Sequence, residues 1–309
     1  MDINSIKLIY FSPTRTTRKI MAGIARGVCA EKVEHIDLTP PDAALQALVE
    51  VNDDLAIIGA PVYAGRIPAE AASRLRRLRG NGTPAVIVVV YGNRAYEDAL
   101  LELRDLAEEA GFRPVAAGAF IGEHSFSGDA TPIAVGRPDG DDLRMAEEFG
   151  RAIREKMKEM RALDDILPLR VPGNFPYKDV AGLAGVTPVS GEGACVRCGE
   201  CASVCPTTAI AVREAAETDA ALRIRCCACV KVCAIGARRM EDPRIRQAAE
   251  WLSANFRERR EPETILGAMI DFCSHAGCFL FDKIIKNCLP RRLCQHHLLF
   301  WHQFWRLLP

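Results

Sequence analysis

The sequence has no excess charge of either sign, no long apolar run and no secretory signal, and each absence excludes a class of function. Its 40 basic residues balance 40 acidic ones, so no overall field attracts nucleic acid, an anionic membrane surface or an acidic substrate. Nowhere are 18 consecutive residues apolar, so we expect no transmembrane segment. The first residues lack the basic and apolar regions of a signal peptide, and we therefore expect a protein of the reducing cytoplasm.

Cysteine, by contrast, is abundant and concentrated. The chain has 13 cysteines in 309 residues, and eight of them lie between Cys195 and Cys233. Such a local density is typical of metal ligation rather than of disulfides spread along a chain. The remaining composition, 49% apolar and 26% charged, is that of an ordinary globular protein that is long enough for two domains.

Short β-branched runs alternate with amphipathic stretches over the first 160 residues, which predicts repeated strand–helix units. The expected strands are residues 6–11, 33–38, 55–60, 85–91 and 115–120. The expected helices are residues 17–30, 41–49, 69–78, 96–110 and 141–160. Residues 85–90 are apolar at every position, as in a strand that is covered on both faces. The pattern predicts an α/β fold with a five-stranded parallel sheet.

Changes in composition divide the chain into parts. We expect an α/β domain at 1–163, a Pro/Gly-rich linker at 164–186, a small cysteine-rich domain at 187–240, a polar helical segment at 241–262 and an atypical tail at 263–309. The tail suggests either a metal site or an interfacial membrane helix at 298–308, but it fits neither pattern well, and we assign it no function. The tail's candidate metal ligands are Cys273, Cys278, Cys288, Cys294, His296 and His297.

The first cysteine motif has the spacing C-x2-C-x2-C-x3-C-P. Its residues are Cys195, Cys198, Cys201, Cys205 and Pro206. This is the run of bacterial ferredoxins, in which three thiolates hold one 4Fe-4S cluster and the fourth ligates a second cluster. A zinc site is the alternative, but zinc usually separates two cysteine pairs by a longer loop. The spacing therefore favours iron–sulfur chemistry.

The second motif lacks one cysteine. Cys226, Cys229 and Cys233 stand at the expected intervals, but the position for the first ligand is occupied by Arg223. By crossed ligation, Cys233 completes the first cluster, and Cys205 joins Cys226 and Cys229 at the second. The first site thus has four thiolates and the second has three. The second site would hold a three-iron cluster, recruit the adjacent Cys227 or a non-protein ligand, or stay empty.

Two neighbours of the second motif affect these alternatives. We favour Cys227 as a small buried residue over Cys227 as a substitute ligand, because free cysteine is readily buried. The cation of Arg223 beside a cluster would stabilise the more negative, reduced state. Ala234 replaces the proline that usually follows the last cysteine, which changes the turn without removing a ligand.

Three loops of the first domain suggest a ligand site. The hydroxyl-rich loop 12–17 lies between the first expected strand and helix, where backbone N–H groups attract an anion. The alternative is an ordinary capped helix start. Loops 61–66 and 91–96 carry tyrosines at the carboxyl ends of later strands, the edge at which open parallel sheets bind ligands.

With these loops and the cysteine motifs, the chain resembles the flavodoxin–ferredoxin fusion proteins of anaerobes over about residues 4–262. The resemblance implies a doubly wound flavodoxin-like domain followed by a small α+β two-cluster ferredoxin-like domain. It also implies FMN, with the phosphate at Ser12, Thr14, Thr16 and Thr17. The ring would lie near Pro61, Tyr63, Gly65, Tyr91, Gly92, Asn93 and Tyr96. Arg15 departs from the family's glycine, and its side chain either restricts the turn, covers the site or pairs with the phosphate.

Together these features predict an electron carrier that passes single electrons between 4Fe-4S clusters and FMN, and onward to an external redox protein. The alternatives are a flavin-dependent reductase of a specific small substrate and a non-redox binding module with structural clusters. His124 follows the last expected strand, and we interpret it as a surface residue rather than a proton relay. We interpret the basic run at 74–79 as a solvated helix face rather than a docking site.

Overall fold

The computed structural model describes residues 1–44, 48–160, 167–180, 185–191 and 193–268. Contacts divide the chain into two compact units, Met1–Met269 and Ile270–Pro309. Everything below concerns the first unit, because the second lies outside the described residues, as do the candidate metal ligands and the membrane helix that we considered for the tail.

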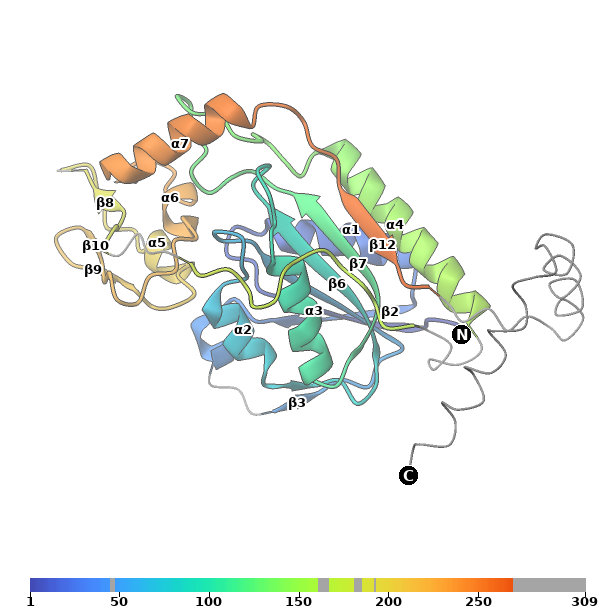
Figure 1. Ribbon diagram of the computed structural model, residues 1–309. Helices are drawn as coiled ribbons and strands as arrows, with labels where there is room; N and C mark the ends of the chain where they lie inside the picture. Colours follow the sequence, from blue (N-terminus) through green and yellow to red (C-terminus); the bar gives the residue numbers. More distant parts are fainter. Residues whose placement is uncertain (45–47, 161–166, 181–184, 192, 269–309) are drawn as a thin grey trace, which may run out of the picture. The chain divides into compact units, whose positions relative to one another are not determined.

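A six-stranded sheet forms the centre of this unit, in the order β12-β7-β6-β4-β1-β2 (Figure 1). Its five parallel strands are β1 (Ser5–Tyr10), β2 (Lys32–Asp37), β4 (Leu55–Pro61), β6 (Pro84–Tyr91) and β7 (Arg113–Ile121). Numbered along the chain, their order is 2-1-3-4-5, which is the flavodoxin-like doubly wound arrangement. The predicted fold class and all five predicted strands are confirmed. The apolar pattern predicts no strand at 263–266, yet β12 (Glu263–Leu266) pairs antiparallel with β7.

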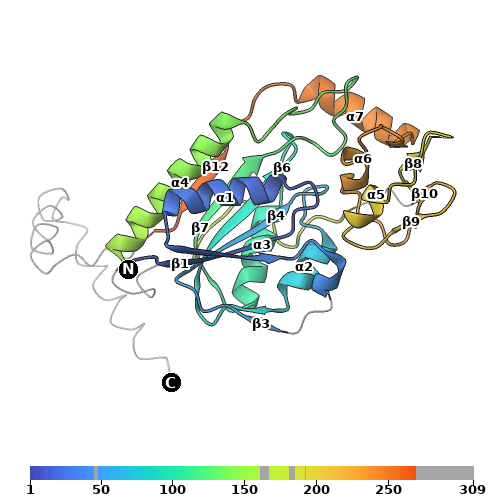
Figure 2. The same ribbon diagram turned by 180° about the vertical axis from the view of Figure 1, so that it is seen from behind.

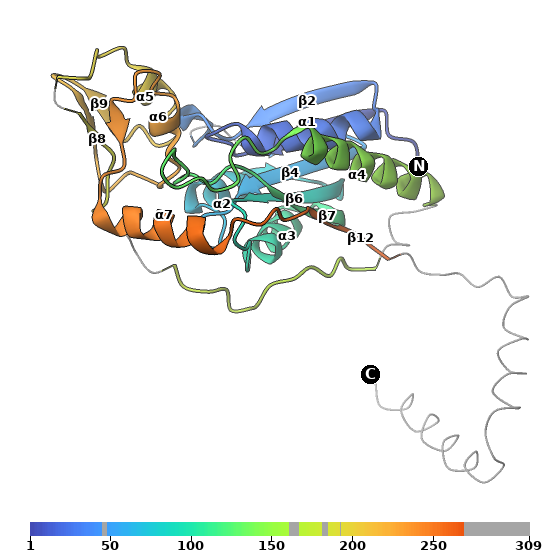
Figure 3. The same cartoon turned by 90° about the horizontal axis from the view of Figure 1, so that it is seen from above.

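Helices cover both faces of the sheet, as Figure 3 shows from above. Helices α1 (Thr16–Val28) and α4 (Gly140–Glu159) lie side by side on one face (Figure 2), and α2 (Ala69–Leu75) and α3 (Ala99–Glu109) pack on the other. The α1–α4 contact depends on Gly27, where a Cβ would come within 2.0 Å of the Glu147 carbonyl oxygen. The buried strands need this double cover because almost every residue of β4 and β6 is apolar.

The prediction of a helix at 41–49 is wrong for the residues at both ends of this range, which the structure describes. Residues Pro41–Ala44 form one 3-10 turn, and Val49 belongs to the short strand β3 (Val49–Glu50). This strand pairs with β5 (Leu78–Arg79). Because β5 includes Leu78, the helix predicted at 69–78 is shorter than expected, and α2 ends at Leu75. Backbone pairing between the two strands thus overrides the helical pattern.

The cysteine-rich segment is a small α+β unit of two short ribbons and two one-turn helices. Its elements are β8 (Val189–Ser190), α5 (Glu200–Ser203), β9 (Ile210–Val212), β10 (Ala216–Thr218), α6 (Ala228–Lys231) and β11 (Arg238–Arg239). The ribbons are β8–β11 and β9–β10. Each helix carries one central cysteine, Cys201 in α5 and Cys229 in α6, and both side chains pack in one core with Ala216. The two motifs therefore occupy equivalent places.

After the cysteine-rich segment the chain returns to the sheet. Helix α7 (Pro243–Asn255) leads into an extended stretch that ends in β12, the orange segments of Figure 1. The start of α7 is defined by Asp242, whose carboxylate accepts a hydrogen bond from the Arg244 amide, and by Pro243 in the first turn.

The linker segment is also packed on the first domain. Leu169 is buried, and Asp98 accepts hydrogen bonds from the amides of Asn174 and Lys178.

Candidate functional site

The loop between β1 and α1 has the geometry of an anion site. Arg15 takes the left-handed conformation (φ 64°) and gives α1 no side-chain cap. The hydroxyl of Thr17 is fully buried and has no hydrogen-bond partner among the described residues. A helix N-terminus with an unsatisfied buried hydroxyl beside it fits a phosphate better than a plain capped start, because buried polar groups are nearly always paired.

Two other residues of this loop, Ser12 and Arg15, differ in burial and in their contacts. Ser12 is buried, and its hydroxyl accepts a hydrogen bond from the Arg18 amide at 3.1 Å, while its own amide donates to Thr39 Oγ1 at 2.8 Å. Arg15 is exposed. It occupies the backbone conformation that glycine would adopt most easily, so an arginine at this position is compatible with the turn.

A cavity of about 310 Å³ lies beside this loop, at the carboxyl ends of β4, β6 and β7. Seven of the residues predicted from the loops line it: Thr14, Thr16, Pro61, Tyr63, Gly65, Tyr91 and Gly92. His124 and Phe126, from the loop after β7, complete this wall. The remaining lining residues come from much later in the chain, from Arg225 and from α7.

Five predicted residues do not line the cavity: Ser12, Arg15, Thr17, Asn93 and Tyr96. Two of these hold the returning chain instead. The Asn93 side-chain amide donates to the carbonyls of Phe256 and Glu258 at 2.8 and 2.9 Å, and the Tyr96 hydroxyl donates to the Glu263 carboxylate at 2.6 Å. The sequence carried no sign of these contacts, because the partners are more than 160 residues apart.

Burial keeps the ring-bearing residues of the cavity uncharged. It raises the pKa of Tyr63 well above its usual value, with the nearby sulfur of Cys226 as a second cause. It lowers the pKa of His124 to about 4, helped by the cations of Lys231 and Arg94. His124 Nδ1 accepts a hydrogen bond from the Phe126 amide at 3.0 Å, so the neutral ring carries its proton on Nε2. The ring packs over Gly92, where a Cβ would meet it at 2.2 Å.

The three cysteines assigned to the second cluster lie together. Cys205, Cys226 and Cys229 are buried and line one small cavity of about 30 Å³. Arg223 lines the same cavity, and its guanidinium donates to the Val186 carbonyl. Cys227 lines it too. Arg223, at the position of the missing ligand, and Cys227, the candidate substitute ligand, therefore both lie at this site. The deep burial of Cys226 raises its pKa to about 12, so binding of iron must displace a proton from that sulfur.

The cysteines assigned to the first cluster lie nearer the surface. Cys198 is exposed, Cys195 and Cys233 are partly exposed, and Cys201 is buried. Arg238 is buried beside this group, where it donates to Ser190 Oγ at 3.0 Å and to the Ala216 carbonyl at 2.6 Å. Within the described residues, no three His, Cys, Asp or Glu side chains converge on one point as the ligands of a single metal ion would.

Polar contacts join the cysteine-rich segment to the sheet domain. Arg74 is 95% buried, and it donates to the carbonyls of Leu38 and Thr39 and, at 2.7 Å, to the carbonyl of Pro206, the residue after Cys205. The interpretation of this arginine as part of a solvated helix face is therefore wrong, because one guanidinium satisfies carbonyls from both segments.

A family model described as a 4Fe-4S binding domain matches residues 189–211. No curated protein matches the chain. Solved structures that match include an archaeal flavodoxin (13% identity, TM-score 0.32, 50% of this chain and 99% of the other). A flavodoxin from Streptococcus pneumonia TIGR4 (17%, 0.35, 49% and 99%) and an NADH:FMN oxidoreductase (19%, 0.37, 51% and 92%) match as well.

No helix in the described part of the chain is long and apolar enough to cross a bilayer. The sheet order identifies the fold of the first domain, and the 4Fe-4S family model matches residues 189–211 of the cysteine-rich segment. The chain therefore combines a flavodoxin-like doubly wound domain with a ferredoxin-type 4Fe-4S binding domain.

Proposed function

We propose that this protein transfers single electrons between 4Fe-4S clusters and FMN, and exchanges them with an external redox protein. One observation carries the proposal: Arg225 lines both the large cavity and the small cavity of Cys205, Cys226 and Cys229. The two cavities are therefore neighbours. A ligand in the first and a cluster in the second would be separated by little more than the residue that precedes Cys226.

The residues around the large cavity fit FMN. Thr14 and Thr16 lie next to the start of α1, whose unsatisfied Thr17 hydroxyl suits a phosphate group. Tyr63 and Tyr91 would lie beside the ring as neutral phenols, and burial raises the pKa of both still further above neutral pH. Bound FMN would supply exchange between one- and two-electron chemistry. The chain's part is to hold the ring among uncharged groups and to restrict water.

The size of the cavity favours a carrier over a reductase. At about 310 Å³ it lies at the lower end of the roughly 300–1,000 Å³ typical of small-molecule sites. One ring system would fill it, and a second small substrate would need further space. The burial of the three sulfurs near this cavity also supports a redox role for the second site over a purely structural one, because exclusion of water is one means by which a protein sets a cluster's potential.

Electrons would enter or leave through the first cluster. We propose Cys195, Cys198, Cys201 and Cys233 as its ligands, and the exposed Val196 and Ile235 beside them would contact the partner protein. We further propose residues 1–163 and 187–240 as the two functional domains, joined by 164–186 and followed by the 241–262 segment, and a cytoplasmic location. Strand β12 then returns the chain to the sheet of the first domain.

The test is the cofactor content of the whole chain purified without oxygen. Iron, acid-labile sulfide and flavin are measured per chain, together with the visible and electron-spin spectra. We expect four irons from the first site, up to four more from the second, and one FMN. Colourless, iron-free protein would falsify the redox function. A protein that contains iron but binds no flavin after addition of FMN would be a ferredoxin-type carrier, and the flavin part of the proposal would be wrong.

A further inference from the structure

Helix α7 turns one face toward the large cavity. Ala248, Trp251 and Leu252 all line it, and this i, i+3, i+4 spacing places them on one side of the helix. Leu252 is buried, whereas Trp251 is 52% exposed. A tryptophan that lines a cavity and remains half exposed offers a large apolar surface that nothing in the described chain covers.

The orientation of Trp251 is restricted by its neighbour. The Phe256 ring contacts the indole edge to face, with the ring centroids 5.2 Å apart and the planes at 67°. The cavity is also lined by Tyr63, Tyr91 and Phe126 from the sheet domain. A flat aromatic ligand in this cavity would have apolar surface available from α7 and from the loops of the sheet domain.

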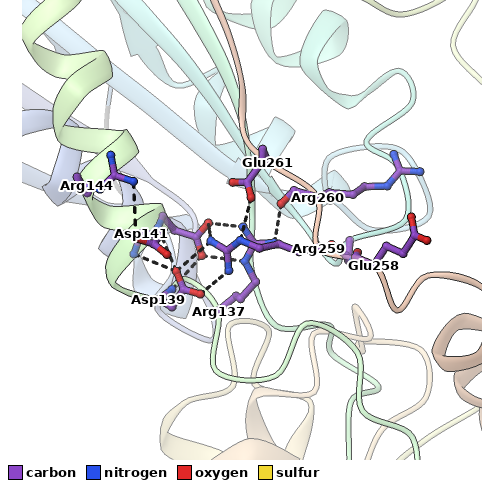
Figure 4. Close-up of polar contacts among 10 residues, drawn as sticks. Arg137, Asp139, Asp141, Arg144, Glu258, Arg259, Arg260 and Glu261 are labelled. Carbon is purple, nitrogen blue, oxygen red and sulfur yellow. Dashed lines mark hydrogen bonds and ion pairs between the residues drawn. The ribbon is translucent and has the colours of Figure 1, made fainter.

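The helix is held against the sheet domain at its carboxyl end. Ser253 Oγ donates to the Pro132 carbonyl at 3.1 Å, and the Asn93 amide binds the carbonyls of Phe256 and Glu258. Figure 4 shows the next contacts, in which Arg137 donates to the Arg260 carbonyl at 2.7 Å and the Arg259 guanidinium pairs with Asp139. Residues from two loops of the sheet domain, the loop after β6 and the loop between β7 and α4, thus hold α7 and the chain that follows it.

From these contacts we infer that Trp251 packs against the isoalloxazine ring of FMN. The flavin site would then be completed by a helix that follows the cluster domain, and the flavodoxin-like domain alone would provide only part of it. This inference rests on the proposed FMN site. Its consequence is that flavin affinity depends on the attachment of α7, so changes outside the cavity that release α7 would also weaken FMN binding.

The test compares FMN dissociation constants for the full-length chain after removal of flavin, measured by quenching of flavin fluorescence. We expect Trp251→Ala to weaken binding about tenfold, because an aromatic contact and its buried area are both lost. Trp251→Phe should lie between Trp251→Ala and the unaltered chain. Glu250→Gln changes an exposed residue on the side of α7 that faces away from Ala248 and Leu252, and this variant should bind FMN as the unaltered chain does.

Tryptophan emission provides a second readout that a merely structural role would not change. FMN should quench part of the emission of the unaltered chain, and that part should be missing in Trp251→Phe, which retains the chain's other two tryptophans. Equal affinity and equal quenching in both chains would overturn the inference. An unaltered chain that binds no FMN would instead overturn the flavin half of the proposed function, and circular dichroism with iron content verifies that each variant is folded.

Discussion

Replacing Arg137 by methionine removes one partner of a buried ion pair and should destabilise the protein strongly. Arg137 is 5% exposed and Asp142 is fully buried. The guanidinium donates from Nε to Asp142 at 2.8 Å and from Nη1 to the Arg260 carbonyl at 2.7 Å (Figure 4). Without it, the Asp142 carboxylate keeps the amide of Asp139 at 2.9 Å and Arg259 at 3.5 Å.

The magnitude follows from the uncompensated charge. Removing one partner of a buried pair costs about 3–5 kcal/mol, and we expect the lower end because Arg259 stays near the carboxylate. At roughly 2–4 °C per kcal/mol for a chain of this size class, the melting temperature should fall by about 6–12 °C. Urea unfolding followed by circular dichroism measures the free energy directly.

Two matched variants separate this effect from a general loss of charge. Arg259→Met removes a partly exposed arginine from the same cluster and should cost less than about 1 kcal/mol. The double variant Arg137→Met with Asp142→Asn should recover most of the stability, because no charge is left buried and the side-chain amide oxygen can still accept from the Asp139 amide. The reasoning is refuted if Arg137→Met loses no more stability than Arg259→Met.

Three further outcomes follow from single groups. Arg223→Cys should raise the iron bound per chain, because it supplies the missing thiolate at the Cys205 site; equal iron in both chains would show that no ligand is missing. Thr17→Val should stabilise the flavin-free chain by about 1 kcal/mol by removing an unpaired buried hydroxyl, and should raise the FMN dissociation constant; unchanged FMN affinity would place the phosphate elsewhere. Burial and the cations of Lys231 and Arg94 lower the pKa of His124 to about 4 from its usual value of 6.5, so its contribution to stability is present above about pH 6.5 and is lost as the pH falls toward 4. His124→Gln should therefore show a flatter loss of unfolding free energy over that range than the unaltered chain, and parallel pH profiles would contradict the assignment.

Local pattern was sufficient for the central sheet. Strands β4, β6 and β7 consist almost entirely of apolar residues that are buried on both faces, and such runs are visible without any knowledge of tertiary contacts. The residues of β2, at the edge of the sheet, are exposed or half-buried. Strand β12 could not be predicted in this way. Its four residues, Glu263–Leu266, are mostly exposed or half-buried and form a strand because they pair with β7, about 145 residues earlier in the chain.

The same limit applied to the site. The loops at the carboxyl ends of β4 and β6 line a cavity, and this edge of the sheet follows from the parallel topology that the sequence predicts. Asn93 and Tyr96 lie in such a loop but hold the chain near 256–263, and no local signal distinguishes the two roles. Arg74 is a similar case, since a charged residue on a helix predicts solvent exposure until a second segment supplies carbonyls for it.

The most direct test of electron transfer between the clusters and FMN is a kinetic one. Chain loaded with iron, sulfide and FMN is mixed without oxygen with less than one electron equivalent of reductant, and the absorbance of flavin and clusters is followed. Because the cavity shares Arg225 with the Cys205, Cys226 and Cys229 site, we expect the electron to redistribute between cluster and flavin at a first-order rate that does not change with protein concentration. A rate proportional to protein concentration would mean that electrons pass only between separate molecules, and would contradict the proposed function.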